Sequence, residues 1–262
     1  MSPGFQLQQG KNRCDMIRIT QIKLSIRHSE EDMINAIAKA LKLSPQNIVK
    51  YQIVRRSIDA RKSEIKYIYT VDVAISESHK EKETSIVKRC RNVNISIADQ
   101  TKYNFKPSGT APLSHRPVVV GTGPAGLYCA WLLAKNGYQP LVIERGEEIR
   151  QRVRSVEHFW KTRELNLESN VQFGEGGAGT FSDGKLNTMV KDTSHRHGFV
   201  LDHFVAHGAP SDILYINKPH IGTDQLRSVI ANIRKDIIQL GGEVRFGSKL
   251  TDLIIEDGFL TQ

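Results

Sequence analysis

The chain has 262 residues, of which 39% are hydrophobic and 25% charged, the proportions of an ordinary globular protein with one large or two smaller domains. No apolar run is long enough to cross a membrane, and three scattered cysteines without a C-x-x-C pair exclude a disulfide framework or a zinc knuckle. We therefore expect a cytoplasmic protein, in which the polar residues 1–15 form a disordered extension.

Positive charge is concentrated in the first part of the chain. Residues 16–105 hold 17 Lys and Arg against 10 Asp and Glu, which is +7 of the total net charge of +9. Residues 106–262 are nearly balanced, with 18 against 17. The basic excess therefore belongs to the first of two predicted domains.

Alternating apolar residues predict that residues 16–102 form a small sheet covered by two helices. The alternation slips once near Gln21, which predicts a bulge, and Ser29 with Asp32 forms a capping box before the first helix. The predicted order is strand 17–26, helix 29–41, strand 48–56, strand 65–75, helix 79–90 and strand 93–97. This β-α-β-β-α-β order is typical of a ferredoxin-like domain, and the Pro- and Gly-containing residues 103–116 predict a linker after it.

The most informative stretch follows that linker. An apolar strand at 117–120 leads into Gly121-Thr-Gly-Pro-Ala-Gly126, which fits G-x-G-x-x-G, and then into an apolar helix ending at Asn136-Gly137. A second strand, 140–143, delivers Glu144, which lies 18 residues after Gly126. Strand, glycine turn, helix, strand and acid together are the fingerprint of a Rossmann-type dinucleotide-binding unit.

Each residue of this fingerprint has a chemical role. We expect Gly121 to make the tight turn, Gly123 to let the backbone approach a pyrophosphate, and Gly126 to let the helix pack closely on the strand. The free amides at the helix start attract phosphate charge. Glu144 is expected to accept hydrogen bonds from the two ribose hydroxyls and to repel a 2′-phosphate.

The remainder of the chain alternates helices with glycine-rich or strand-like segments. Thr223 or Asp224 is expected to cap a long helix that ends at Leu240, and Asp257-Gly258 predicts a hairpin turn. Because the sequence stops inside that hairpin, we expect a domain 117–262 that is truncated at its C-terminus. The predicted elements are helix 147–164, glycine-rich stretch 171–186, helix 197–207, helix 223–240 and strands 243–246 and 250–256.

Four motifs together resemble a group of poorly characterised bacterial FAD-utilising dehydrogenases, flavoproteins with a glutathione-reductase-type nucleotide domain. The motifs are residues 119–127, 142–146, 170–186 and 218–224, and the resemblance extends over residues 16–262. It implies an α/β protein in which an N-terminal α+β ferredoxin-like domain precedes a partial FAD/NAD(P)-binding Rossmann-type domain. The family also has a later strand and glycine turn over the flavin, which this sequence lacks.

The resemblance also implies which residues bind FAD. The pyrophosphate is expected at the glycine turn, the adenosine ribose beside Glu144 and Arg145, and the ribityl chain and flavin ring along the second glycine-rich stretch. The residues carried over are Gly121, Gly123, Pro124, Ala125, Gly126, Glu144, Arg145, Gly174, Gly176, Gly177, Gly179 and Lys185.

Two residues are candidates for a role in catalysis. Lys185, at the end of the glycine-rich stretch, is suited to stabilise negative charge on a reduced flavin ring. His220 precedes a predicted helix start, where an anionic substrate can bind, although a loop histidine bonded to backbone fits equally well. The predicted activity is hydride transfer between a small-molecule substrate and FAD, with NAD(P)H as an electron donor.

Three alternatives are open to the same sequence. Gly179 to Lys185 matches the opening of a phosphate-binding loop, but Leu186 stands where the magnesium-binding hydroxyl belongs. A metal site is suggested by His195, His197, His203 and His207 with Asp202, but we expect His203 and His207 to face solvent and predict no metal. A plain NAD-binding protein is the third alternative.

A nucleic-acid role is suggested by the basic first domain. Arg55, Arg56, Arg61 and Lys62 surround a strand connection, which points to an RNA-associated binding module or a flavoprotein RNA modifier. Tyr67 and Tyr69, however, share a face with core valines and are predicted to point inward, away from any base. We therefore expect no nucleic-acid partner.

Overall fold

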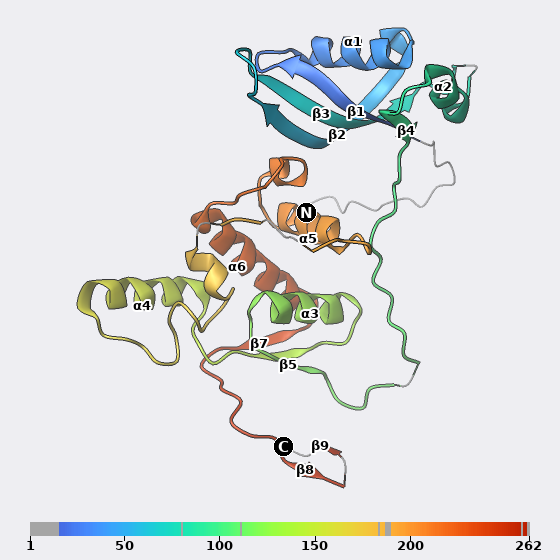
Figure 1. Ribbon diagram of the computed structural model, residues 1–262. Helices are drawn as coiled ribbons and strands as arrows, with labels where there is room; N and C mark the ends of the chain where they lie inside the picture. Colours follow the sequence, from blue (N-terminus) through green and yellow to red (C-terminus); the bar gives the residue numbers. More distant parts are fainter. Residues whose placement is uncertain are drawn as a thin grey trace. The chain divides into compact units, whose positions relative to one another are not determined.

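The computed structural model describes residues 16–79, 81–110, 112–182, 184–186, 190–257 and 259–260. The chain forms two compact units (Figure 1). The first comprises the residues up to Thr101 together with 214–217, and the second comprises residues 102–213 and 218–262. The predicted disordered extension, residues 1–15, lies outside the described residues.

The first unit is a four-stranded antiparallel sheet with the strand order β2-β3-β1-β4. Residues 214–217 pair with the edge strand, since the amide of Arg56 donates to Tyr215 O and the amide of Asn217 donates to Arg56 O. The elements follow in the predicted order: β1 (Ile17–Ser25), α1 (Glu30–Leu41), a 3-10 turn (Pro45–Asn47), β2 (Ile48–Asp59), β3 (Lys66–Ile75), α2 (Glu83–Cys90) and β4 (Ile95–Ile97).

Two local predictions for this unit are confirmed. The pairing of β1 with β3 shifts register between Ile19 and Ile22, and Gln21 has a φ of 62°, which is the predicted bulge. Ser29 caps α1: its hydroxyl oxygen accepts a hydrogen bond from the amide of Asp32, and the carboxylate of Asp32 accepts one from the amide of Ser29. Both features are set by neighbouring residues, which is why the sequence alone identifies them.

The core of the first unit joins one face of the sheet to the inner faces of its helices. Ile17, Ile19, Val71 and Val73 of the central strands pack with apolar side chains of α1, among which Ile37 is completely buried. Tyr69 is buried as predicted, and Tyr67 packs against the same core. Neither ring is therefore a free stacking platform.

The second unit contains a three-stranded parallel sheet with the order β5-β6-β7. Figure 1 shows α3 and α6 on the same face of this sheet. Its elements are β5 (Val118–Val120), α3 (Pro124–Lys135), β6 (Leu141–Ile143), α4 (Ile149–Thr162), 3-10 turns at Ala178–Phe181 and Ser211–Leu214, α5 (Arg196–Ala206), α6 (Thr223–Gln239), β7 (Glu243–Arg245), β8 (Ile255–Glu256) and β9 (Phe259–Leu260).

The core of the second unit lies between this sheet and its helices. Val119 and Val142, at the centres of β5 and β6, pack against α3 and α6. The predicted inner face of α3 is confirmed, because all four residues expected there are buried: Leu127, Ala130, Trp131 and Ala134. Because parallel strands end together, this packing brings the loops after β5 and β6 to one edge of the sheet.

Two predictions for the C-terminal part are wrong. The N-cap of α6 is Gly222, with no side-chain hydrogen bond, and Asp224 instead pairs with Arg227 at 3.2 Å. Of the predicted strand 250–256, only Ile255–Glu256 is a strand, because it is the part that finds a partner in β9. The hairpin itself is present, whereas Gly258 of its predicted turn lies outside the described residues. Within the described part of the chain, no helix has the length and apolarity needed to cross a membrane.

Candidate nucleotide-binding site

A pocket of about 270 Å³ lies at the C-terminal edge of the parallel sheet. In an open α/β sheet this edge is where ligands bind, because the loops that follow the strands leave a crevice between them. The pocket is lined by the ends and following loops of the three strands and by the glycine-rich stretch: Val120, Gly121, Gly123, Ile143, Glu144, Arg145, Gln172, Phe173, Gly174, Gly177, Ser248, Lys249 and Leu250.

The glycine turn after β5 has the geometry that its sequence predicts. Gly121 has a φ of +92°, a conformation that a side chain disfavours, and its amide donates to Ile143 O at 2.7 Å. A Cβ on Gly126 would lie 1.9 Å from Gly121 O, so the helix approaches the turn too closely for any side chain. A Cβ on Gly123, in contrast, would meet no protein atom within 4 Å. Gly123 therefore borders space that a ligand can fill.

Helix α3 begins at this space without a side-chain cap. Its N-cap is Gly123, Pro124 is its first residue, and no acidic residue occupies its first turn. The first amides of a helix have no intrahelical partner, and the helix dipole makes this end positive. The pocket consequently presents an anion-binding helix start of the kind that holds a pyrophosphate.

Glu144 forms the buried floor between the first two loops. Its carboxylate accepts hydrogen bonds from the amide and the hydroxyl of Thr122, both at 2.7 Å, and from the amide of Gly146 at 2.8 Å. An ionised carboxylate offers about four acceptor positions, so one remains for a ribose hydroxyl. Glu144 thus brings the predicted negative charge to the pocket, and it also joins the two loops, which the sequence did not predict.

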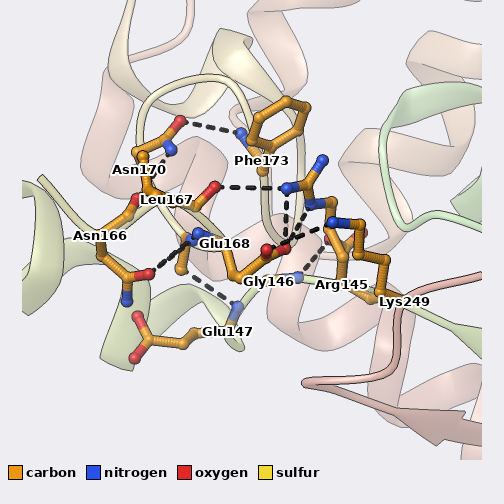
Figure 2. Close-up of polar contacts among 11 residues, drawn as sticks. Arg145, Gly146, Glu147, Asn166, Leu167, Glu168, Asn170, Phe173 and Lys249 are labelled. Atoms are coloured by element: carbon orange, nitrogen blue, oxygen red, sulfur yellow. Dashed lines mark hydrogen bonds and ion pairs between the residues drawn. The ribbon is translucent and has the colours of Figure 1, made fainter. Parts of the chain in front are cut away.

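Arg145, Phe173 and Lys249 line one wall of the pocket. Figure 2 shows the polar contacts around Arg145 and Lys249. Its guanidinium lies 2.7 Å from Glu168 Oε2 and 3.8 Å from the centre of the Phe173 ring. Lys249 reaches the other oxygen of the same carboxylate at 3.4 Å. The hydrogen bond from Arg145 lowers the pKa of Glu168. This wall therefore combines two cations and an aromatic ring, and the Glu168 carboxylate links the two cations.

Arg152 holds the glycine-rich stretch from inside. It is completely buried and donates hydrogen bonds to the carbonyl oxygens of Asn170, Val171, Glu175 and Gly177 and to the hydroxyl of Thr180. Burial lowers its pKa to about 10, so the guanidinium remains charged at neutral pH. One side chain thereby fixes a loop that has few side chains of its own.

Glycines are required where this loop passes other groups. A Cβ on Gly174 would lie 2.5 Å from Cδ of Arg152, and a Cβ on Gly146 would lie 2.6 Å from Cα of Gly174. Gly174 also has a φ of +118°. The loop therefore packs directly against the turn after β6 and leaves its outer backbone toward the pocket.

Glu175 is a further buried acidic residue in this region. Its carboxylate accepts from the amide of Ile149 at 2.7 Å and lies 2.8 Å from Nε of Arg234, which also contacts Glu148. Burial raises the pKa of Glu175 and opposes the effect of Arg234. Sequence reasoning missed both Arg152 and Glu175. The available signal was the spacing of Ile149, Arg152 and Val156, which puts the arginine on the apolar face of α4.

The structure gathers only some of the predicted binding residues around the pocket. Gly121, Gly123, Glu144, Arg145, Gly174 and Gly177 line it, whereas Pro124, Ala125, Gly126, Gly176, Gly179 and Lys185 do not. The catalytic candidates Lys185 and His220 face each other in a short antiparallel bridge, in which Ile221 N donates to Gly184 O and Leu186 N donates to Pro219 O. The fold therefore brings together two residues that lie 35 positions apart in the sequence.

The prediction that His203 and His207 face solvent is wrong. His203 is only 5% exposed and packs against Trp131, with ring centres 3.9 Å apart. The side chain of His207 is 12% exposed and lies beside Asp236 rather than Asp202. Asp202 instead pairs with Lys102 at 3.5 Å. The error arose because the partner of this helix face, α6, is distant in the sequence.

Comparison with protein families identifies two segments. Residues 119–191 match the NAD(P)-binding Rossmann-like domain, and residues 16–74 match a domain of unknown function (DUF8436). The first match includes the glycine turn, Glu144 and the glycine-rich stretch. The second unit therefore contains a Rossmann-like nucleotide-binding domain.

The chain is also similar to two curated proteins, to one over most of its length and to the other over about a third. An uncharacterized protein from Clostridium beijerinckii is 47% identical over 245 residues, which is 93% of this chain and 45% of that protein. Digeranylgeranylglycerophospholipid reductase from Methanocaldococcus jannaschii is 34% identical over 89 residues, which is 32% of this chain and 22% of that protein. The chain thus spans less than half the length of either relative.

Proposed function

We propose that this chain carries the FAD-binding site of an oxidoreductase that transfers hydride between a small-molecule substrate and the flavin. The observation that supports this most strongly is the pocket at the edge of the parallel sheet, where the first glycine turn, Glu144 and the glycine-rich stretch meet. The reductase name of the distant archaeal relative agrees with an oxidoreductase.

The pocket suits the adenosine diphosphate half of a dinucleotide. Free amides at the start of α3 would hold the pyrophosphate, and the remaining acceptor position of Glu144 would receive a ribose hydroxyl. The negative charge of Glu144 disfavours a 2′-phosphate at the same ribose. FAD is preferred to NAD because the sequence motif 170–186, which forms the second glycine loop, resembles that of FAD-utilising dehydrogenases.

The protein residues would orient the cofactor and exclude water from it. The bound flavin supplies the hydride-transfer chemistry. Arg152 keeps the loop 170–180 in one shape, so the backbone that faces the cofactor is already ordered before binding. Lys185 would stabilise negative charge near the ring, and His220, its neighbour in the bridge, would contact substrate. NAD(P)H is the proposed electron donor.

We also propose that the first unit is a ferredoxin-like domain. The support is its antiparallel strand order β4-β1-β3-β2 together with the β-α-β-β-α-β sequence of elements. An RNA-associated role for this basic unit has less support, because Tyr69 is buried and Tyr67 lies against the core rather than on an exposed stacking surface.

An absorbance spectrum of the purified chain, with identification of any released cofactor, tests the proposed function. We expect flavin absorption bands and FAD in the released material, either as purified or after incubation with FAD. Gly123→Ala provides the matched variant, since its Cβ would meet no protein atom but would enter the pyrophosphate space. We expect FAD affinity to fall at least tenfold (about 1.4 kcal/mol) with unchanged thermal stability.

Gly198→Ala is the control for this experiment, because a Cβ at Gly198 also meets no protein atom within 4 Å and Gly198 does not line the pocket. It should bind FAD as the wild type does. Release of NAD alone, or equal FAD affinity in the wild type and Gly123→Ala, would contradict the proposal.

A further inference from the structure

Helices α5 and α6 bring three metal-ligating side chains together outside the nucleotide pocket. His203 lies on α5, His207 is the C-cap of that helix four residues later, and Asp236 lies on the facing side of α6. One ligand atom from each of the three lies within 4.8 Å of the others. Two histidines on one helix face with a carboxylate from a second helix are a common arrangement for binding a transition metal.

The ring of His207 is oriented as a ligand would be. Its Nδ1 lies 2.8 Å from the backbone oxygen of His203, and because a carbonyl only accepts, Nδ1 carries the hydrogen. In a neutral imidazole the other nitrogen, Nε2, has a lone pair, and this nitrogen lies 3.3 Å from Asp236 Oδ2. Two acceptors at this distance repel unless a proton or a cation lies between them.

His203 supplies a second, independent indication of a ligand. Although it is 5% exposed, neither ring nitrogen has a hydrogen-bond partner among the described residues. The surrounding rings of Trp131 and Tyr128, at 3.9 and 5.1 Å, give its nitrogens no acceptor. Burial, followed by the neighbouring His207, lowers the pKa of His203 to about 3, so the imidazole is neutral and keeps a lone pair at neutral pH.

The carboxylate is held in place and is accessible. Trp131 donates its indole hydrogen to Asp236 Oδ2 at 2.6 Å, which resembles the outer hydrogen bonds that orient metal-ligating carboxylates. The Asp236 side chain is 34% exposed, so an ion can reach the cluster from solvent. Among the described residues whose charges act on His203, the cation is the ammonium of Lys135. It lies 4.6 Å from the centre of the Trp131 ring.

We propose that His203, His207 and Asp236 bind one divalent transition-metal ion, for which Zn²⁺ is the best fit. Two imidazole nitrogens and one carboxylate oxygen suit Zn²⁺ better than Mg²⁺ or Ca²⁺, which prefer oxygen ligands. Three protein ligands leave a fourth position for water or another small ligand. The ion would join α5 to α6 and occupy the space between the two facing acceptors.

The test is titration of the tag-free, metal-stripped full chain with ZnCl₂ by isothermal calorimetry. We expect one Zn²⁺ per chain. His207→Gln and Asp236→Asn should each weaken binding at least tenfold, and Asn retains an acceptor for the Trp131 hydrogen. His203→Phe keeps an aromatic ring in the buried position and should weaken binding to the same extent. Circular dichroism of each variant shows whether it is folded, which separates loss of the ligand from loss of the fold.

Two controls address non-specific binding. Asp202→Asn removes an exposed carboxylate from the same helix, and His158→Gln removes an exposed histidine paired with Glu164. Both should bind Zn²⁺ as the wild type does. Co²⁺ should also give the visible absorption bands of a site with nitrogen and oxygen ligands in the wild type but not in His207→Gln. Absence of saturable binding, or wild-type affinity in folded His207→Gln and Asp236→Asn, would overturn the proposal.

Discussion

The two units are stabilised in different ways. The sheet of the first unit is held by apolar side chains that alternate along the central strands β1 and β3 and meet α1, where Ile37 is completely buried. The edge of the second unit that forms the pocket consists of glycine-rich loops, which offer few side chains to pack. A single arginine, Arg152, holds these loops by donating hydrogen bonds to five of their oxygen atoms. A binding site made from backbone therefore depends on buried polar groups rather than on apolar contact.

The largest effect is expected from Arg152→Met. The substitution keeps much of the side-chain volume but leaves buried carbonyl oxygens without donors, so the free energy of unfolding of the second unit should fall by about 3–5 kcal/mol. FAD binding should be lost at the same time, because the loop 170–180 no longer has a fixed shape. Urea unfolding and flavin titration measure the two effects.

Arg150→Met is the control for that substitution, since Arg150 is exposed on the same helix. It should change neither quantity by more than about 0.5 kcal/mol. If Arg152→Met and Arg150→Met behave alike, the glycine loop is not held by the buried guanidinium.

Ile37→Ala should destabilise the first unit without affecting the pocket of the second. This side chain is fully buried in the first core, and its truncation should cost about 3 kcal/mol in the unfolding of the first unit. FAD affinity should stay within twofold of the wild type, because the pocket belongs entirely to the second unit. Ile26→Ala, at a position 49% exposed, is the matched control for stability. A loss of flavin binding in Ile37→Ala that matches the loss in Arg152→Met would remove the distinction between the units.

A smaller effect is expected from the pH dependence of the second unit. The pKa of His203 is about 3 in the folded chain and near its ordinary value of 6.5 after unfolding. The unfolded state therefore takes up a proton between these values that the folded state does not, and stability falls as the pH decreases below 6.5.

Unfolding measured at pH 7 and pH 5 in the presence of a chelator tests this expectation. His203→Phe should reduce the dependence by up to about 1.4 kcal/mol per pH unit. His207, Asp236 and Lys135 also act on the pKa of His203, so the slope of His203→Phe is compared with that of the wild type, in which all three groups are present. An unchanged slope in His203→Phe would mean that this imidazole does not titrate across the unfolding transition.

Local patterns allowed much of the fold to be predicted. The bulge at Gln21, the capping box of α1, the inner face of α3 and the close approach at Gly126 each depend on residues within a few positions of one another. The match of residues 119–191 to the Rossmann-like family agrees with the glycine fingerprint. These features are recognisable because one side chain or one dihedral angle determines each of them.

The features that were missed depend on partners far apart in the sequence. In the sequence, nothing distinguishes Arg152 from a surface cation, because the carbonyl groups that surround it belong to residues 170–177. The sequence predicts that His203 and His207 are exposed, because α6, which covers their side of α5, is distant in the chain. Its residue Asp236 lies 29 residues beyond His207. The residues 250–254 look like a strand but have no neighbouring strand to pair with in the described chain. Tertiary contact, rather than local preference, decides all three.

Titration with FAD, followed through the quenching of flavin fluorescence, measures whether the pocket binds the cofactor. We predict a single saturable site on the full chain, competition by ADP for the adenosine end of the pocket, and an affinity at least tenfold lower in Gly123→Ala than in Gly198→Ala. Absence of saturable FAD binding by the wild type, or binding that neither ADP nor Gly123→Ala affects, would contradict this prediction.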